Sequence, residues 1–379
     1  MKTNKTLRSA LAALLAVWLV LLLCIPALAA ESGTLSIGNL DDLCAFAASC
    51  ASDSYSKNLK VNLTADIDAG NEEISVPVFY GTFNGQNHKI YNIKLANSAS
   101  DYGFFSRIES GAVVKNLTVR GEVTPSGTQK NVGGIAGVNS GAIENCTFSG
   151  VVIGTSCVGG IAGKNTSNGT VTGSTAVGVV RGTQFTGGVV GQNDGTVTRG
   201  TNMAAVNTTV SEDDLKTADI ETTVYSLLKQ EDVKENAITT DTGGIAGYST
   251  GILQSCTNSG TVGYPHVGYN VGGIAGRQNG YMANCTNRGE VLGRKDVGGV
   301  VGQMAPDITL QFSPSGLDEL QDELNALQSL IDTALGDAES ASNTVSGRIS
   351  RISGYADSAR SSASSMAGQR IWSTITFPP

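Results

Sequence analysis

The chain has 379 residues, of which 48 are glycine and only 6% are aromatic. That glycine share is nearly twice the roughly 7% average, and a compact globular core is usually built with more aromatic bulk than this. The net charge of −8 and the pI near 4.9 argue against nucleic acid and anionic membrane surfaces as partners.

Residues 1–29 have the pattern of a secretory signal peptide. A basic start precedes an uncharged apolar run from Leu11 to Ile25, and Ala27-Leu28-Ala29 is an A-x-A cleavage pattern. The run is shorter than the ~20 residues that span a bilayer, which disfavours a membrane anchor. We therefore expect cleavage after Ala29, a secreted or cell-surface protein, and no membrane span after cleavage.

Residues 39–51 are predicted to form an amphipathic helix with Asn39 as its N-cap. The apolar face is expected to hold Leu40, Leu43, Cys44, Ala47 and Ala51. Such a helix can cover the exposed strand edges of a following β-structure. We therefore assign residues 30–58 to an N-terminal capping region.

A glycine signature, Gly-Gly-x-x-Gly, repeats along the middle of the chain at intervals of 26, 28, 56, 29 and 26 residues. Its glycines are Gly133, Gly134, Gly137, Gly159, Gly160, Gly163, Gly187, Gly188, Gly191, Gly243, Gly244, Gly247, Gly272, Gly273, Gly276, Gly298, Gly299 and Gly302. The 56-residue interval equals two repeat lengths, which predicts that one turn there is degenerate or replaced.

Each repeat is interpreted as one coil of a parallel β-solenoid. Glycine serves where the backbone needs a positive φ or approaches another backbone closely, and short β-rich runs such as Val151-Val152-Ile153 lie between the glycines. A single coil cannot bury its inner face, so coils stack at the ~4.8 Å strand spacing. We expect a mainly β fold of about eight or nine coils over residues 59–303. A propeller is disfavoured because a repeat lacks residues for four strands, and an α-solenoid because helical periodicity is absent.

A second element, a polar–small–Thr triplet, follows each glycine signature. It occurs as Asn145-Cys146-Thr147, Gly173-Ser174-Thr175, Ser255-Cys256-Thr257 and Asn284-Cys285-Thr286, with the earlier forms Asn116-Leu117-Thr118 and Asn92-Ile93-Lys94. The middle position is apolar in the earlier forms, so we expect its three cysteines to point inward. Cys256 and Cys285 stack in adjacent coils by this alignment, and a bridge between them stays open.

These residues resemble a known repeat family. Gly134-Ile135-Ala136-Gly137 and Gly188-Val189-Val190-Gly191 look like the GLUG motif of bacterial surface proteins, and Phe83 to Ile90 and Thr64 to Asp68 are similar to the opening segments of such regions. The resemblance covers residues 35–305 and implies a parallel β-helix. It also implies a setting among adhesin-like proteins, or among large surface enzymes whose catalytic domains lie outside the repeats.

The segments outside the repeat are predicted to be helical. Ser211-Glu212-Asp213-Asp214 before an apolar stripe predicts a helical insertion over about 205–238. Residues 304–316, with two prolines, read as a linker. Leucine and isoleucine steps of three and four predict a coiled coil or helical hairpin over 317–368, through which the chain is expected to form a homo-oligomer. Residues 369–379 fit neither pattern and look truncated.

Chemistry-bearing residues are sparse. Asp66 and Asp68 are the one close acid pair of the repeat region, in reach of acid–base work on a shared strand face, although a solvated edge is the favoured interpretation. His88 and His266 have no partnered nucleophile in sequence, which gives a triad no support. With two histidines and no C-x-x-C, we expect neither a metal site nor a cofactor.

The sequence therefore predicts a non-enzymatic, exported repeat protein. Its leading role is an adhesin-like or stalk module that presents a solenoid face to a glycan or to a host or cell-surface protein. A polysaccharide-active β-helix enzyme is the first alternative. A structural spacer without a ligand is the second.

Overall fold

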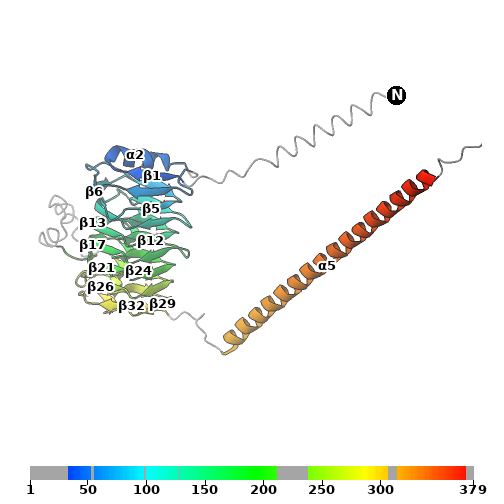
Figure 1. Ribbon diagram of the computed structural model, residues 1–379. Helices are drawn as coiled ribbons and strands as arrows, with labels where there is room; N and C mark the ends of the chain where they lie inside the picture. Colours follow the sequence, from blue (N-terminus) through cyan, green and yellow to red (C-terminus); the bar gives the residue numbers. More distant parts are fainter. Residues whose placement is uncertain are drawn as a thin grey trace, which may run out of the picture. The chain divides into compact units, whose positions relative to one another are not determined.

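A computed structural model describes residues 33–52, 55–97, 100–127, 129–210, 238–305 and 314–372. The chain divides into two compact units, Met1–Asp307 and Ile308–Pro379. The first unit is a parallel β-solenoid of about nine turns with a short N-terminal helix (Figure 1), and the second contains one long helix. The predicted fold class is confirmed. The predicted signal peptide, residues 1–29, lies outside the described residues.

Four parallel sheets, named A to D, form the walls of the solenoid. Sheet A contains β1 (Thr34–Ile37), β2 (Lys60–Leu63), β5 (Thr82–Asn84), β8 (Val113–Lys115), β12 (Ala142–Glu144), β16 (Thr170–Thr172), β20 (Thr196–Thr198), β25 (Ile252–Gln254) and β29 (Tyr281–Ala283). Sheet B contains β3 (Ile67–Asp68), β6 (Lys89–Leu95), β9 (Thr118–Val123), β13 (Thr147–Ile153), β17 (Thr175–Arg181), β21 (Thr201–Asn202), β26 (Thr257–Asn258) and β30 (Thr286–Asn287), and β22 (Ala205–Val206) also pairs with β17.

The other two walls meet along the glycine signature. Sheet C contains β4 (Val76–Phe79), β7 (Phe105–Ile108), β11 (Ala136–Asn139), β15 (Ala162–Asn165), β19 (Val190–Asn193), β24 (Ala246–Ser249), β28 (Ala275–Gln278) and β32 (Val301–Met304). Sheet D contains β10 (Lys130–Gly133), β14 (Ser156–Gly159), β18 (Gln184–Gly187), β23 (Thr240–Gly243), β27 (Tyr269–Gly272) and β31 (Lys295–Gly298).

One full coil passes through the sheets in the order D, C, A, B, as β10, β11, β12 and β13 do. Each of these strands has only three to seven residues, so four fit into one repeat. A repeat thus has room for four short strands, contrary to the expectation above, and these strands form one solenoid coil as predicted. Neighbouring coils pair in register, and Gly133 lies opposite Gly159.

All signature glycines except Gly299 sit where the corner between sheets D and C leaves no room for a side chain. A Cβ on Gly134 would lie 2.2 Å from the Phe148 ring and 2.4 Å from the carbonyl oxygen of Gly160. None of the eighteen signature glycines has a positive φ. Close backbone approach, rather than a left-handed backbone, is thus what requires glycine here. The left-handed position of the corner falls on other residue types, such as Asn131 with φ 55°.

The helix α2 (Leu40–Ser49) covers the N-terminal end of the core (Figure 1). Asn39 caps it as predicted, because its side chain accepts a hydrogen bond from the Asp42 amide at 2.9 Å. The predicted apolar face was partly wrong: Cys44 and Ala51 are exposed, whereas Phe46 is buried. The reason is an aromatic cluster in the first coils, into which Phe46 inserts.

That cluster is the widest part of the core. The Phe46 ring lies 6.1 Å from Phe79 and 5.9 Å from Phe83, and the Phe104 and Phe105 rings are 4.9 Å apart. The fully buried phenylalanines of the described chain are Phe46, Phe79, Phe83, Phe104, Phe105 and Phe148. Later coils are filled by valine, isoleucine, alanine and cysteine, which need less width.

The 56-residue interval holds one coil, not two. β18 pairs directly with β23, β19 with β24 and β20 with β25, so no coil lies between them. The extra residues enter after β22, and residues 211–237 lie outside the description. The predicted start of the insertion at 205 was therefore early, because Ala205 and Val206 still belong to sheet B.

Two buried asparagine ladders run through the stack. In the first, Asn139 donates to Asn165, Asn165 to Asn193, and Asn193 to Ser249. In the second, Asn202 donates to Asn258, and Asn258 to Asn287, at 2.8 Å each. Each amide also bonds a backbone carbonyl, such as that of Gly169 for Asn165. The ladder oxygens also accept hydrogen bonds from turn amides, such as that of Gly141 for Asn139 and that of Gly260 for Asn258, so the ladders satisfy turn N–H groups outside the strand pairing.

The second unit contains α5 (Pro314–Trp372), a single continuous helix. The hairpin alternative is therefore wrong, and the helix extends past the predicted bounds of 317 and 368. Its apolar side chains Leu324, Leu327, Leu330, Ile331, Leu335, Val345, Ile349, Ile352 and Tyr355 are all at least half exposed. Among the described residues, no helix has both the length and the apolar character to cross a membrane.

Candidate functional site

Outward side chains follow the corner between sheets D and C from coil to coil. We name this line the D–C stripe; it comprises Asp101, Arg107, Asn131, Cys157, Lys164, Phe185, Gln192, Asp241, Tyr248, Asn270 and Arg277. Two repeat positions supply it. One is the left-handed residue next to or within each sheet D strand, such as Phe185 with φ 54°. The other is the third residue of each sheet C strand, where Gln192, Tyr248 and Arg277 pair in register.

The stripe is most densely built around Tyr248. The Phe185 ring stacks on Tyr248 with 5.3 Å between centroids and 28° between planes, and the Arg277 guanidinium lies 5.4 Å from the Tyr248 ring centroid. Arg277 also holds Asp241 in a two-point contact, with Nε 2.9 Å from Oδ1 and Nη2 3.0 Å from Oδ2. Asn270 donates to the same Oδ1 at 2.8 Å. A guanidinium fixed by a carboxylate and stacked on a ring is oriented for recognition.

Asp241 is the buried anchor of this cluster. Its side chain is 1% exposed, whereas that of Arg277 is 35% exposed. A buried carboxylate costs desolvation free energy unless cations and donors surround it. Arg277 and Asn270 supply these contacts, so the charge of Asp241 fixes the position of both side chains on the surface.

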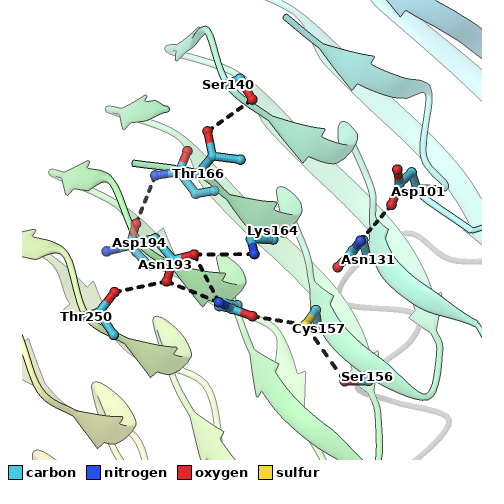
Figure 2. Close-up of polar contacts among 12 residues, drawn as sticks. Asp101, Asn131, Ser140, Ser156, Cys157, Lys164, Thr166, Asn193, Asp194 and Thr250 are labelled. Atoms are coloured by element: carbon cyan, nitrogen blue, oxygen red, sulfur yellow. Dashed lines mark hydrogen bonds and ion pairs between the residues drawn. The ribbon is translucent and has the colours of Figure 1, made fainter. Parts of the chain in front are cut away.

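An ionic cluster occupies the N-terminal part of the stripe. Arg107 lies 2.8 Å from Asp101 and 3.0 Å from Glu109, and Asn131 donates to Asp101 at 2.6 Å. The hydrogen bond to Glu109, followed by that to Asp101, raises the pKa of the Arg107 guanidinium. Figure 2 shows the bond between Asn131 and Asp101, which joins consecutive coils.

The middle of the stripe continues onto the neighbouring turn between sheets C and A (Figure 2). Lys164 lies 3.4 Å from Asp194, which accepts a hydrogen bond from Thr250 at 2.9 Å. Beside them, Thr166 donates to Ser140 at 3.0 Å. Polar side chains of four coils are thus joined in two groups, Ser140 with Thr166, and Lys164 with Asp194 and Thr250.

Asp66 and Asp68, the close acid pair of the repeat region, make separate contacts in the fold. Asp66 accepts from the Lys89 amide and lies 3.1 Å from His88 Nδ1, whereas Asp68 accepts from Asn92 and from the Gly70 amide. The bond from the Lys89 amide, then that from His88, lowers the pKa of Asp66. Each carboxylate therefore has its own structural partners.

The two histidines lie in different surroundings. His88 contacts Asp66, while His266 is exposed at a left-handed turn position. The contact of His88 with Asp66 has no signal in the sequence, because it joins residues that precede successive strands of sheet B. The described residues contain no group of three or more His, Cys, Asp or Glu side chains that could hold a metal ion.

The cysteines at the triplet position point inward as predicted. Cys146 and Cys256 are fully buried, Cys285 is half-buried, and all three are free thiols. Burial raises the pKa of Cys146 to about 12. Cys256 and Cys285 are hydrogen-bonded neighbours, and that bond lowers the pKa of the more accessible Cys285. The two thiols are not bridged.

One pocket, of 260 Å³, lies between α2 and β4 and is lined by Cys44, Ala47, Ala48, Ala51, Glu73, Ile74, Ser75 and Pro77. Its one acid, Glu73, accepts hydrogen bonds from Tyr102 and from the Asn97 amide. The acid is thus fixed within the fold, and the pocket has fewer polar groups to offer a ligand than the D–C stripe has.

Comparisons with known proteins support the repeat assignment. The GLUG motif matches residues 128–153, the coil of β10 to β13. Halomucin of Haloquadratum walsbyi is 31% identical over 133 residues, which is 30% of this chain and 1% of halomucin. A crystal structure of a candidate immunoglobulin A1 protease from Bacteroides ovatus is 16% identical and covers 67% of this chain and 85% of that chain, with a TM-score of 0.37. The chain thus spans about one hundredth of the curated relative.

Proposed function

The chain is a GLUG-motif protein whose repeats form a parallel β-solenoid, and from this premise we propose that it is a non-enzymatic, exported surface protein that binds along its D–C stripe. The ligand is an extended glycan or a protein segment. The observation that carries the proposal is the stack of Phe185, Tyr248 and Arg277 on the outer surface. Tyrosine and arginine are the residue types enriched where proteins bind partners.

The regular spacing of the stripe supports an extended ligand. Successive coils place equivalent side chains about 4.8 Å apart, so a polymer lying along the axis meets a new donor or acceptor at each step. The aromatic side chains provide apolar contact area and lose little conformational entropy when a ligand binds. The ionic clusters can fix the orientation of the ligand. A flat rigid face of this kind binds without a deep pocket.

Export is proposed from the predicted signal peptide in residues 1–29. N-terminal sequencing of the protein recovered from the producing cell's surface or medium tests this step. A mature chain that begins at Ala30 supports export, and a chain that retains Met1 in the cytoplasm contradicts it.

The absence of catalysis is proposed because the candidate acids have structural partners. Asp66, Asp68 and Asp241 each accept hydrogen bonds within the fold. Incubation with surface polysaccharides, followed by mass spectrometry of soluble products, tests this. Shortened oligosaccharides whose formation is lost in Asp66→Asn would establish the enzyme alternative instead.

The helix α5 is proposed to associate with α5 of other copies. Its exposed leucine and isoleucine side chains, among them Leu327 and Ile331, match the three–four spacing of a coiled coil. Light scattering of the full chain carrying Val297→Lys, which opposes any association through the last coil of the solenoid, tests this proposal. Ile331→Asp lowers the measured mass if the helices pair, whereas a mass that this substitution leaves unchanged contradicts pairing.

Binding itself is tested with immobilised glycans and extracellular-matrix proteins. Phe185→Ala and Tyr248→Ala are expected to weaken saturable binding about tenfold or more, which corresponds to about 1.4 kcal/mol. Tyr91→Ala is the matched control, because Tyr91 is a half-exposed tyrosine with Lys89 5.3 Å from its ring centroid, on sheet B. If the wild-type protein binds none of the tested glycans or proteins, the result favours the alternative that the solenoid is a structural spacer without a ligand.

A further inference from the structure

The two ends of the solenoid differ in whether a described element covers their strand edges. At the N-terminal end, α2 covers the first coils and inserts Phe46 among their rings. At the C-terminal end, sheets A, B, D and C end at β29, β30, β31 and β32. Among the described residues, no strand pairs with the outer edges of these four. We name them the end face.

Apolar side chains that earlier coils bury are exposed on the end face. Val297 is 44% exposed, whereas Val271, its in-register partner one coil earlier, is 1% exposed. Val300 is also 44% exposed, whereas Ile274 at the same repeat position is fully buried. The side chains are those of an interior coil, although the described residues place no coil beyond them.

Gly299 is the strongest indication that another backbone segment packs against this edge. At its counterparts Gly244 and Gly273, a Cβ would lie 2.2 Å from a carbonyl oxygen of the next coil. At Gly299 a Cβ would meet nothing within 4 Å. The position thus keeps the one residue type that a closely approaching backbone requires, on an edge that is open among the described residues.

The chain between the solenoid and α5 is too short to supply that backbone. β32 ends at Met304 and α5 begins at Pro314, so nine residues separate them. A coil of this protein takes 26 to 29 residues. Nine residues can therefore pair with one strand edge, but not with four.

The charges of the last coil are compatible with a contact between like faces. Arg288, Arg294 and Lys295 lie on it together with Glu290 and Asp296. A two-fold arrangement can set the two negative groups of each copy against positive groups of the other copy, because an isologous contact uses the same surface on both copies. A surface of one sign would repel itself.

We propose that the end face docks against the end face of a second copy of this chain, through pairing of strand edges and burial of Val297 and Val300. Two solenoids then join end to end about a two-fold axis, and each supplies the backbone that the other's edge lacks. The contact is independent of the D–C stripe and of α5.

The test uses the full chain carrying Leu327→Asp and Ile331→Asp, which removes any pairing through α5. Light scattering over a dilution series measures its mass, and hydrogen–deuterium exchange measures protection of the amides of residues 295–304. A dimer is expected, with protection that falls on dilution. Gly299→Val and Val297→Lys are each expected to raise the dissociation constant about tenfold or more. Gly336→Val, at a helical glycine with nothing within 4 Å, is the matched control.

Two results overturn the proposal. One is a chain that stays monomeric at every concentration, whether or not the amides of 295–304 are protected. The other is a dimer whose dissociation constant neither Gly299→Val nor Val297→Lys changes. Both variants alter exposed positions, so circular dichroism is expected to show the wild-type fold. Loss of glycan or protein binding leaves these outcomes unaffected.

Discussion

Asn139 donates its side-chain amide to Asn165, its counterpart one coil later, at 2.8 Å. Asn165 repeats the contact with Asn193 at the same distance. Both side chains are fully buried, so each amide exchanges solvent for a neighbour of its own kind and for a turn carbonyl. The coils are therefore joined by a polar spine as well as by strand pairing.

Asn165→Ala is expected to lower the free energy of unfolding by about 2–4 kcal/mol, because it removes the donor to the buried Asn193 Oδ1 and one of the two acceptors of the Asn139 amide. Urea denaturation followed by circular dichroism measures the change. Asn287→Ala is the control, since Asn287 is half-buried at the last position of the second ladder among the described residues. An equal decrease in the free energy of unfolding in the two variants would show that the buried interior position of Asn165 contributes no more stability than the half-buried position of Asn287.

Gly160→Ala is expected to destabilise the solenoid by about 1–3 kcal/mol or more through overpacking. The new Cβ would lie 2.4 Å from the Gly188 carbonyl oxygen and 2.6 Å from the Ala176 Cβ. Gly299→Ala, at the equivalent open position, is expected to change the free energy of unfolding by less than about 0.5 kcal/mol in dilute protein. Thermal unfolding compares the two. Similar melting temperatures would contradict the close-approach account.

Arg277→Ala is expected to cost about 3–5 kcal/mol, because it leaves the buried Asp241 carboxylate without its cation. Arg107→Ala is expected to cost about 1 kcal/mol or less, since its partner Asp101 is 26% exposed and water replaces the contact. Denaturant unfolding of both variants measures the difference. A larger loss for Arg107→Ala would reverse the assignment of Asp241 as the anchor.

Stability is expected to fall above pH 9 through Cys146. Its pKa is raised from 9.0 to about 12 in the folded chain by burial. The unfolded thiol therefore ionises first, so stabilisation is complete below pH 9 and is lost as the pH rises towards 12. The slope for this one group is about 1.4 kcal/mol per pH unit.

Cys146→Ala isolates this contribution from other groups that titrate in the same range. Its free energy of unfolding is expected to decline less steeply between pH 9 and 12 than that of the wild type. Identical slopes would show that the thiol is not protected from ionisation. At neutral pH, alkylation of the folded protein is expected to label the exposed Cys44 while sparing Cys146.

The coil could be predicted from the sequence because the close backbone contacts at its corners permit only glycine. Backbone contact at each corner excludes every side chain, so glycine recurs at the repeat interval. The inward direction of Cys146 was predicted for the same reason, since stacking places it in line with Leu117. The asparagine ladder had a signal too: Asn139, Asn165 and Asn193 each lie two residues after a signature glycine. Asparagine is also a common turn residue, so this repeated position was not recognised as a ladder of buried side chains.

The stack of Phe185 on Tyr248 could not be predicted while the 56-residue interval could still contain a degenerate turn. Such a turn would place the two residues two coils apart, whereas the observed pairing of β19 with β24 makes their coils adjacent. The burial of Phe46 on α2 was missed for a related reason. Its orientation depends on where Phe79 and Phe83 project, and helical periodicity alone does not contain that information.

The concentration of buried phenylalanine between positions 46 and 148 gives the solenoid a direction. In the proposed export, a chain that crosses the membrane with its N-terminus leading presents these residues before the slender, valine-rich turns. The phenylalanine-rich coils can then fold while the C-terminal part of the chain is still crossing the membrane. Each later coil needs only to pair with the strand edges that are already formed. Assembly of the rod can thus keep pace with its own emergence, without the whole molecule having to be present.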